Sequence, residues 1–517
     1  MACPQCHWAG GDGQWVGSHR PFQGALHDGG RVLSNPDSPP EALYAAREPV
    51  FPRRVKGNFR TLKWWIMAVT LGIYYVTPWL RWDRGPNLPD QAVLIDMAGR
   101  RFFFFMIEIW PHEFYFVAGL LIMAGLGLFL FTSALGRVWC GYACPQTVWT
   151  DLFILVERWI EGDRNARIRL HRQIWDAEKL RKRAVKWTVW FLIGLATGGA
   201  WIFYFTDAPA LLRDLLNFSA PPIAYITMLV LTMTTFVFGG FAREQICIYA
   251  CPWPRIQAAM LDEDSITVAY RDWRGEPRGK LKHGEAEAAG QGDCIDCMAC
   301  VNVCPMGIDI RNGQQLACIT CALCIDACND VMDKIGKPRG LIGYLALTDE
   351  ALERAGSPPK PVWAHVFRVR TMVYTVLWAA VGIALVVALF LRTEIDINVT
   401  PVRNPTFVML SDGSIRNAYD FRLLNKHGED RDFYISISSD ESMRVSLEGT
   451  TELRVTVPAN QTRMQRVYLT AEPGSPAAND ERTDLTFWVE DRVSNERVSH
   501  KTIFNGLDRD EPEERDD

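Results

Sequence analysis

The chain has 517 residues, which exceeds the usual size of a single domain, so we expect several domains. Its formal net charge is only −5, from 55 basic and 60 acidic side chains, and gives no general electrostatic attraction for nucleic acid. Hydrophobic residues make up 48% of the chain and are concentrated in a few long stretches, which indicates membrane segments beside soluble ones.

Residues 1–60 are predicted to form a loosely ordered cytoplasmic tail, because Gly, Pro and charged residues are frequent between positions 9 and 57. No apolar core of a cleavable signal peptide is visible in this segment. Cys3, Cys6 and His7 match the Cys-x-x-Cys-His pattern of c-type haem attachment. That attachment takes place outside the cytoplasm, whereas the tail is expected inside. We therefore favour a dispensable tail or half of a metal site over a haem.

Five segments are long and apolar enough to cross a bilayer, which needs about 20 residues. They are Trp64–Leu80, Phe114–Leu135, Trp187–Phe205, Pro222–Ala242 and Met372–Leu391. None contains Asp, Glu, Lys, Arg or His, and such residues usually mark the ion paths of membrane pumps. The composition argues against a pump. It predicts a membrane domain at residues 61–260 and a fifth transmembrane helix at 371–392.

Basic residues indicate the orientation of these segments. The loop 136–185 carries ten Lys and Arg residues, whereas the loop 206–221 carries only Arg213. By the positive-inside rule, the N-terminus, the loop 136–185 and the segment 243–371 lie in the cytoplasm, and the chain after Arg392 lies outside. None of the 14 cysteines follows Cys328, so all of them fall on the reducing side of the membrane.

A six-residue motif occurs twice, each time directly after a membrane segment. The copies are Cys140-Gly-Tyr-Ala-Cys144-Pro145 and Cys247-Ile-Tyr-Ala-Cys251-Pro252. Residues four apart share a helix face, so each pair can direct two sulfurs to one point, and the Pro ends or kinks the helix. The repeat predicts a duplicated two-helix unit with a four-thiolate site. Such a site suits Cu(I) or iron–sulfur chemistry, and a redox-active dithiol or plain buried thiols are the alternatives.

Two runs of cysteines carry the strongest functional signal. The first is Cys294, Cys297, Cys300 and Cys304, and the second is Cys318, Cys321, Cys324 and Cys328. This spacing is typical of chains that bind two 4Fe–4S clusters, in which the fourth Cys of each run ligates the other cluster. We therefore assign Cys294, Cys297, Cys300 and Cys328 to one cluster, and Cys318, Cys321, Cys324 and Cys304 to the second. Zinc sites and disulfides are less compatible with this spacing. Residues 261–370 are expected to form a ferredoxin-like domain and a linker.

Apolar and polar residues alternate after Arg392, as in Ile395-Asp-Ile-Asn-Val and Leu485-Thr-Phe-Trp-Val. Turn residues such as Asp412-Gly413 interrupt the alternation. The pattern predicts an antiparallel β-sandwich of the immunoglobulin type at residues 393–506. Residues 507–517 form an acidic tail.

Together, the paired Cys-x-x-x-Cys-Pro motifs, the double cysteine run, the five apolar segments and the terminal sandwich resemble the bacterial cytochrome c oxidase accessory protein family (the FixG/RdxA/CcoG type). The resemblance extends from about Arg53 to Gly506. It implies a multi-domain, polyferredoxin-like protein of the bacterial inner membrane. The expected parts are a five-span α-helical membrane part, a cytoplasmic two-cluster ferredoxin-like insert and a C-terminal periplasmic immunoglobulin-like β-sandwich.

The resemblance also implies a function. Members look like cupric reductases that convert Cu(II) to Cu(I) during maturation of cbb3-type oxidases. The implied cofactors are two 4Fe–4S clusters, and Cys140, Cys144, Cys247 and Cys251 are the candidate copper site. The implied partners are the lipid bilayer, copper ions, oxidase subunits or their copper chaperones, and an unknown electron donor. The alternatives are a quinol-linked electron-transfer subunit of a periplasmic reductase, or a non-enzymatic scaffold for oxidase assembly.

Overall fold

The computed structural model describes residues 7–8, 15–16, 49–86, 88–280, 290–393 and 395–507. In the N-terminal unit, Met1–Pro49, strand β1 (His7–Trp8) pairs antiparallel with β2 (Trp15–Val16). Cys3, Cys6 and most of the predicted acidic tail lie outside the described residues. All other elements belong to the unit Val50–Asp517.

Among the described residues, four helices are long and apolar enough to cross a membrane, judged by length and composition. They are Pro111–Leu135, Ala177–Ile202, Pro222–Ala242 and Val369–Leu391. The first joins the short η2 (Pro111–Glu113) to α2 (Tyr115–Leu135), and the third joins α8 (Pro222–Thr235) to the π-helix η3 (Phe236–Ala242). The others are α6 (Ala177–Ile202) and α15 (Val369–Leu391). These helices match four of the five predicted segments.

The remaining predicted segment, Trp64–Leu80, falls in α1 (Asn58–Val76) and the short η1 (Thr77–Trp79). The first turns of α1 carry Arg60 and Lys63, and both side chains are buried. They pair with Asp151 of α4 (Pro145–Glu161), at 2.9 Å for Arg60 and 3.9 Å for Lys63. The structure therefore supports a membrane protein but does not confirm the count of five spans.

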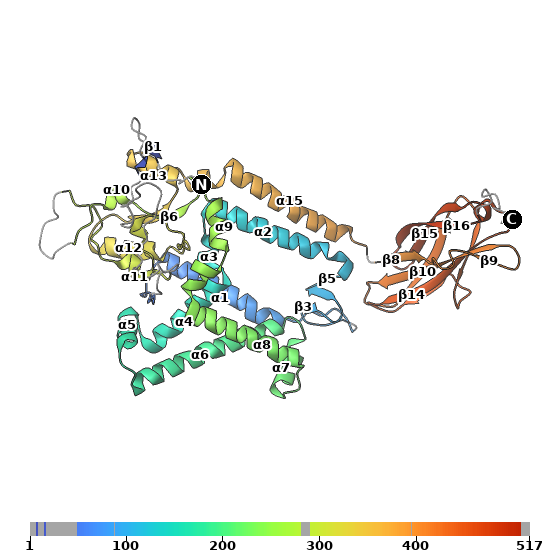
Figure 1. Ribbon diagram of the computed structural model, residues 1–517, viewed down its shortest axis with the longest axis horizontal. Coiled ribbons are helices and arrows are strands. Elements are labelled where there is room, and N and C mark those ends of the chain that lie inside the picture. The colour runs from blue at the N-terminus through green and yellow to red at the C-terminus, as the bar shows by residue number, and fades with distance from the viewer. Residues whose placement is uncertain are drawn as a thin grey trace, which may run out of the picture. The chain divides into compact units, whose positions relative to one another are not determined.

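Glycines allow close contacts between the long apolar helices. α2 and α15 lie side by side (Figure 1), and a Cβ at Gly119 of α2 would overlap Leu385 of α15. α6 packs on α8, and a Cβ at Gly198 would lie 2.6 Å from the carbonyl oxygen of Met228. Small residues at helix contacts are usual in membrane bundles.

Short elements connect the long helices. They are the antiparallel sheet β3 (Val93–Asp96), β4 (Arg101–Phe104) and β5 (Ile107–Ile109), and the helices α3 (Val138–Tyr142), α5 (Arg164–Arg172), α7 (Ala208–Leu216), η4 (Ile246–Ala250) and α9 (Trp253–Met260). Like η3, η4 is a π-helix, so wide helical turns both precede and contain Cys247. Such turns are rare and often accompany functional sites.

The cysteine-rich insert is framed by strand β6 (Thr267–Tyr270), which pairs antiparallel with β7 (Ile342–Leu345). Between the strands lie α10 (Asp272–Gly275), α11 (Ala299–Val303), η5 (Ile310–Asn312) and α12 (Leu323–Lys334). Two helices, α13 (Leu347–Arg354) and α14 (Val362–Val366), lead from β7 to α15.

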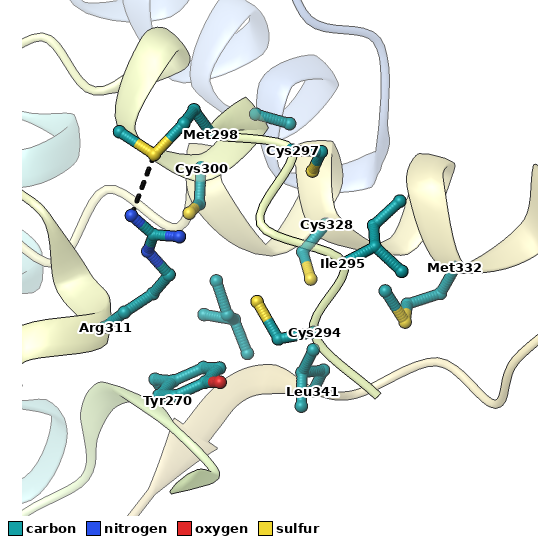
Figure 2. Close-up of a pocket in the computed structure, with 12 residues that line it drawn as sticks. Tyr270, Cys294, Ile295, Cys297, Met298, Cys300, Arg311, Cys328, Met332 and Leu341 are labelled. Carbon is teal, nitrogen blue, oxygen red and sulfur yellow. Dashed lines mark hydrogen bonds between the residues drawn. The ribbon is translucent and has the colours of Figure 1, made fainter. Parts of the chain in front are cut away.

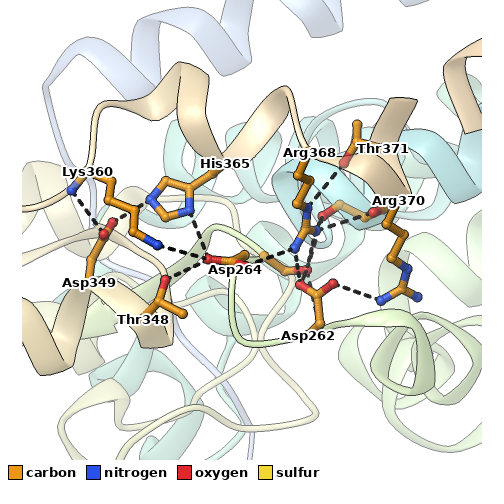
Figure 3. Close-up of polar contacts among 11 residues, drawn as sticks. Asp262, Asp264, Thr348, Asp349, Lys360, His365, Arg368, Arg370 and Thr371 are labelled. Atoms are coloured by element: carbon orange, nitrogen blue, oxygen red, sulfur yellow. Dashed lines mark hydrogen bonds and ion pairs between the residues drawn. The ribbon is translucent and has the colours of Figure 1, made fainter. Parts of the chain in front are cut away.

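A polar network holds the start of α15 against the residues that follow α9 (Figure 3). His365 of α14 is buried, and its Nε2 lies 2.7 Å from Oδ2 of Asp349. Arg368 and Arg370 both pair with Asp262, at 2.5 and 2.9 Å. Loss of Asp349 would leave Nε2 of the buried His365 without its hydrogen-bond partner, whereas the Asp262 pairs are partly exposed and contribute less.

The C-terminal strands form two antiparallel sheets, as predicted. One has the order β12-β14-β10-β8, with β9 paired to β10, and the other has the order β13-β11-β15-β16. The strands are β8 (Ile395–Pro401), β9 (Val408–Met409), β10 (Ile415–Asn425), β11 (Arg431–Ser438), β12 (Met443–Leu447), β13 (Arg454–Val457), β14 (Thr462–Ala471), β15 (Arg482–Asp491) and β16 (Glu496–Asn505), with the short helix α16 (Pro476–Asn479). Alternate side chains, including Tyr419, Phe421, Phe433 and Phe487, form the core.

Candidate metal centres

Four cysteines face one small pocket in the insert (Figure 2). They are Cys294, Cys297 and Cys300 from the first run and Cys328 from the second. Apolar side chains, among them Ile295, Met332 and Leu341, line most of the rest of the pocket, together with Tyr270 and Arg311. The structure thus brings together the four residues that the spacing assigned to one cluster.

A second pocket gathers Cys318, Cys321, Cys324 and Cys304. Its apolar walls include Met306, Ile308 and Ile319. Cys300 lines this pocket as well as the first, so the two pockets adjoin. We call these four the second cysteine set, and Cys294, Cys297, Cys300 and Cys328 the first.

The backbone explains how neighbouring cysteines reach one pocket. Asp296 and Met298 flank Cys297 with φ of 52° and 58°, and Thr320 and Ala322 flank Cys321 with φ of 55° and 60°. Left-handed conformations at non-glycine residues cost energy and persist where the surroundings enforce them. The same pair of left-handed residues in both runs wraps each chain tightly around its pocket.

Burial disfavours deprotonation of these thiols unless a positive charge lies nearby. It raises the pKa of Cys300 to about 11 and that of Cys304 and Cys328 to about 12. A thiolate bound to iron has its charge compensated directly, so the buried sets fit a cluster well. Four sulfurs around each apolar pocket also match the ligand number of a 4Fe–4S cluster.

The two pockets have different polar surroundings. At the first, Arg311 is almost fully buried and contacts Asp296 at 2.6 Å and Asp309 at 2.7 Å. One of its guanidinium nitrogens also lies 2.8 Å from the Met298 sulfur (Figure 2). At the second, the Tyr344 hydroxyl donates a hydrogen bond to the carbonyl oxygen of Thr320, at 3.3 Å. Hydrogen bonding and charge near the sulfurs tune cluster potentials, so the two centres are not equivalent.

The two Cys-x-x-x-Cys-Pro motifs also converge. Burial raises the pKa of Cys247 to about 12, and the neighbouring thiols of Cys144, Cys140 and Cys251 add to the effect. The Cys140 thiol donates a hydrogen bond to Oε1 of the buried Gln257, at 3.1 Å. We call Cys140, Cys144, Cys247 and Cys251 the membrane-edge thiols.

The segment that carries Cys140 and Cys144 packs on the second cysteine set. Cys140 and Cys247 pack in one apolar cluster with Ile319 and Cys321. The Tyr142 hydroxyl donates a hydrogen bond to the carbonyl oxygen of Cys321, at 3.2 Å. Gly141 permits this approach, because a Cβ there would lie 2.6 Å from the carbonyl oxygen of Ile319.

Within the described residues, no group of three or more His, Cys, Asp and Glu could hold a single metal ion. A zinc ion binds sulfur at about 2.3 Å and therefore needs its thiolates close together. The membrane-edge thiols likewise do not form a ready single-ion site, so their assignment to copper stays a proposal.

Sequence reasoning missed several residues of these sites. Gln257, Arg311 and Tyr344 stand outside any motif, and their roles depend on contacts between distant parts of the chain. Gly141 could have been noticed, because it is the one position within the five residues from Cys to Cys at which the two repeats differ.

Curated relatives cover nearly the whole chain. It is 75% identical to protein RdxB of Cereibacter sphaeroides over 474 residues, which span 92% of this chain and 99% of that protein. It is 70% identical to RdxA of the same organism, across 87% of this chain and 95% of the relative. It is 54% identical to the nitrogen fixation protein FixG of Rhizobium meliloti, across 90% and 94%.

Family models match three regions. A 4Fe–4S dicluster domain matches residues 242–346, a 4Fe–4S binding domain matches 116–163, and the Ig-like fold at the C-terminus of FixG matches 385–507. The dicluster match contains both cysteine sets, so the protein carries iron–sulfur centres of the electron-transfer type. With these relatives and the sandwich in place, the chain belongs to the FixG/RdxA family of polyferredoxin-like membrane proteins.

Proposed function

We propose that this protein is a membrane-bound cupric reductase that serves the maturation of a cbb3-type cytochrome c oxidase. Two 4Fe–4S clusters, held by the first and second cysteine sets, supply one-electron transfer when bound. The substrate is Cu(II), which takes up one electron to become Cu(I). The membrane-edge thiols are the proposed copper site, because thiolates favour Cu(I) over Cu(II).

The observation that carries the proposal is the packing of the Cys140–Pro145 motif on the backbone of the second cysteine set. Cys140 and Cys321 belong to one buried apolar cluster, and Cys247 packs against it. A short apolar path of this kind suits electron transfer between adjacent centres. The hydrogen bond from Tyr142 to Cys321 holds the two sites together.

We propose the following topology. The chain crosses the inner membrane five times, with α1 as the first span, the insert in the cytoplasm and the sandwich in the periplasm. Support comes from the four long apolar helices and from the ten basic residues of the loop 136–185. Tags in the loop 163–183 and after Gly506 should report the cytoplasm and the periplasm, respectively. A cytoplasmic C-terminus would contradict the five-span count.

Reduction of Cu(II) by the purified protein tests the activity. The full chain, purified without oxygen and reduced with dithionite that is then removed, should convert Cu(II) to Cu(I), measured with a Cu(I)-specific chelator. Replacing Cys140 and Cys144 with Ser should slow this conversion while the iron content stays unchanged. A matched variant, Cys247→Ser with Cys251→Ser, should act in the same way because the two motifs form one site.

The opposite result has a clear meaning. Full clusters, normal Cu(I) binding and an unchanged rate in a variant lacking all four membrane-edge thiols would show that these thiols are structural. If cells that carry cluster-free variants still assembled an active oxidase, a scaffold role would replace the reductase role. The proposed partners are oxidase subunits or their copper chaperones, and co-purification through the periplasmic sandwich would identify them.

A further inference from the structure

Arg137 is a buried cation that connects the two kinds of cysteine site. It directly precedes α3 and is only 4% exposed. One of its guanidinium nitrogens donates a hydrogen bond to the carbonyl oxygen of Leu316, two residues before Cys318 of the second cysteine set. Its Nε donates to Oε1 of Gln257 at 3.3 Å, and the same oxygen accepts the hydrogen bond from the Cys140 thiol. Arg137 therefore bridges the second cysteine set and the membrane-edge thiols.

Within the described part of the chain, no carboxylate forms an ion pair with Arg137, whose partners are a neutral carbonyl and a neutral amide. By contrast, the buried Arg60 and Lys63 both pair with Asp151. Burial of a charge is strongly unfavourable unless an opposite charge compensates it. A 4Fe–4S cluster with four thiolate ligands carries a net negative charge, so a cluster at the second cysteine set would provide that compensation.

The charge of Arg137 acts on sulfurs of both sites. Burial raises the pKa of Cys318, and the opposing influences are the backbone N–H of Thr320 and the charge of Arg137. Burial raises the pKa of Cys140 to about 11, and Arg137 opposes this rise as well. A positive charge in a buried, weakly polar region favours the more negative state of any centre within its range.

The first cysteine set has no comparable positive neighbour. Arg311 lines its pocket, but the carboxylates of Asp296 and Asp309 lie 2.6 and 2.7 Å from the guanidinium and cancel its charge. Reduction adds one negative charge to a 4Fe–4S cluster, and the surrounding charge is one of the factors that set its potential. The unbalanced charge of Arg137 therefore favours reduction at the second cysteine set, whereas the balanced charges around Arg311 do not favour it at the first.

We propose that Arg137 is an electrostatic positioning residue, which raises the reduction potential of the 4Fe–4S cluster at the second cysteine set above that of the cluster at the first. Arg137 thereby favours the transfer of one electron from the first cluster to the second, which oxidises the first, reduces the second and moves no proton. The electron is then held beside the membrane-edge thiols. This direction of transfer rests on the proposed function, whereas the effect of Arg137 on the two potentials does not involve copper.

The test is a redox titration of the full-length, cluster-loaded chain in lipid nanodiscs without oxygen, followed by EPR. The signal that Cys321→Ser alters identifies the cluster at the second cysteine set. In the wild type this signal should appear at a higher potential than the other. Arg137→Gln should lower the ratio of reduced to oxidised second cluster about tenfold at a fixed potential, which is a shift of about 59 mV for one electron. The first cluster should titrate as in the wild type.

Three further variants separate the charge of Arg137 from its hydrogen bonds. Arg137→Lys keeps the charge without the planar guanidinium and should keep the second cluster near its wild-type potential. Gln257→Glu keeps Arg137 but places a carboxylate beside its Nε, so it should lower the potential of the second cluster as Arg137→Gln does. Lys179→Gln is the matched control. Lys179 is also buried and donates to backbone carbonyls, but these belong to α5 and the residue after it, so both potentials should stay unchanged.

Several results would overturn the inference. One is a wild-type protein in which the second cluster has the lower potential, and this result requires no variant to fold. Others are equal shifts of both clusters in Arg137→Gln, or an Arg137→Lys protein that titrates like Arg137→Gln. If Arg137→Gln loses iron, Gln257→Glu replaces it, and an unchanged second potential there would count equally against the inference. A wild-type protein that has the expected potentials but does not reduce Cu(II) would overturn the proposed function alone.

Discussion

Replacing Gly141 with Ala tests whether the Cys140–Pro145 motif must pack closely on the second cysteine set. The new Cβ would lie 2.6 Å from the Ile319 carbonyl oxygen, 3.0 Å from Cys321 Cα and 3.1 Å from Cys321 N. All three atoms belong to the backbone, so no side chain can rotate away. Ordinary contacts begin at 3.4 Å, so the two segments must separate by about 0.8 Å. Overpacking of this kind typically costs about 1–3 kcal/mol.

The separation acts on one centre more than the other. Because the displaced atoms belong to Ile319 and Cys321, the cluster of the second set should lose stability or change its EPR signal, while that of the first set stays as in the wild type. The hydrogen bond from Tyr142 to Cys321 should weaken, and Cu(II) reduction should slow. EPR of the dithionite-reduced protein, iron analysis and thermal unfolding measure these effects.

A matched control separates the contact from the loss of a glycine. Gly125 lies in α2, and a Cβ added there meets no atom within 4 Å. Gly125→Ala should therefore leave the clusters, the copper reduction and the unfolding temperature unchanged or slightly improved. If Gly141→Ala were indistinguishable from Gly125→Ala in all three measurements, the direct contact would not matter for the function.

Three further predictions concern single features. Arg311→Gln should disturb the EPR signal of the first cluster only, because it removes the charge partner of Asp296 and Asp309; equal changes at both clusters would contradict this. Although burial raises the pKa of Asp262, hydrogen bonds from Arg368, Ser265 and Arg370 hold it below the usual value. Its contribution to stability is therefore complete above about pH 4 and is lost as the pH falls through the lower folded-state pKa. Asp262→Asn should unfold at a lower temperature than the wild type at pH 7, and its unfolding temperature should fall less below pH 4. If the unfolding temperatures of the two proteins ran parallel across this pH range, the pairing would be refuted. Removal of iron by a chelator should make residues 261–370 sensitive to protease while residues 393–506 stay resistant, because only the insert depends on its buried sulfurs.

The grouping of the insert cysteines could be predicted because it depends on local spacing. A run of two, two and three intervening residues limits where each sulfur can point, and each pocket contains the four cysteines that the spacing grouped, with Cys300 lining both. The β-sandwich could also be predicted from the sequence, because strict alternation of apolar and polar residues places all apolar side chains on one face of each strand. By contrast, the three-stranded sheet β3-β4-β5 lacks a long alternating pattern, so the sequence did not predict it.

The first predicted membrane segment shows that the length of an apolar stretch is not by itself a sufficient criterion for predicting a membrane span. Trp64–Leu80 contains no charged residue, yet the helix that includes most of it begins at Asn58 and carries the buried Arg60 and Lys63. Their partner, Asp151, is about 90 residues away in the sequence. Composition of the segment alone cannot reveal such a pair, because the charges become compatible with burial only through a distant part of the fold.

The repeat itself illustrates why a motif predicts a site more readily than its contacts. Both copies read Cys-x-Tyr-Ala-Cys-Pro, and this similarity predicts symmetric pairs of thiols. The variable residue is Gly141 in one copy and Ile248 in the other. Gly141 lets its helix rest on the backbone of the second cysteine set, whereas Ile248 packs with its side chain against the same apolar cluster. The duplicated unit has therefore diverged at the position that meets the insert. The first copy makes a close backbone contact, and the second adds an apolar side chain to the cluster. Two Gly residues or two Ile residues at these positions would not provide both contacts.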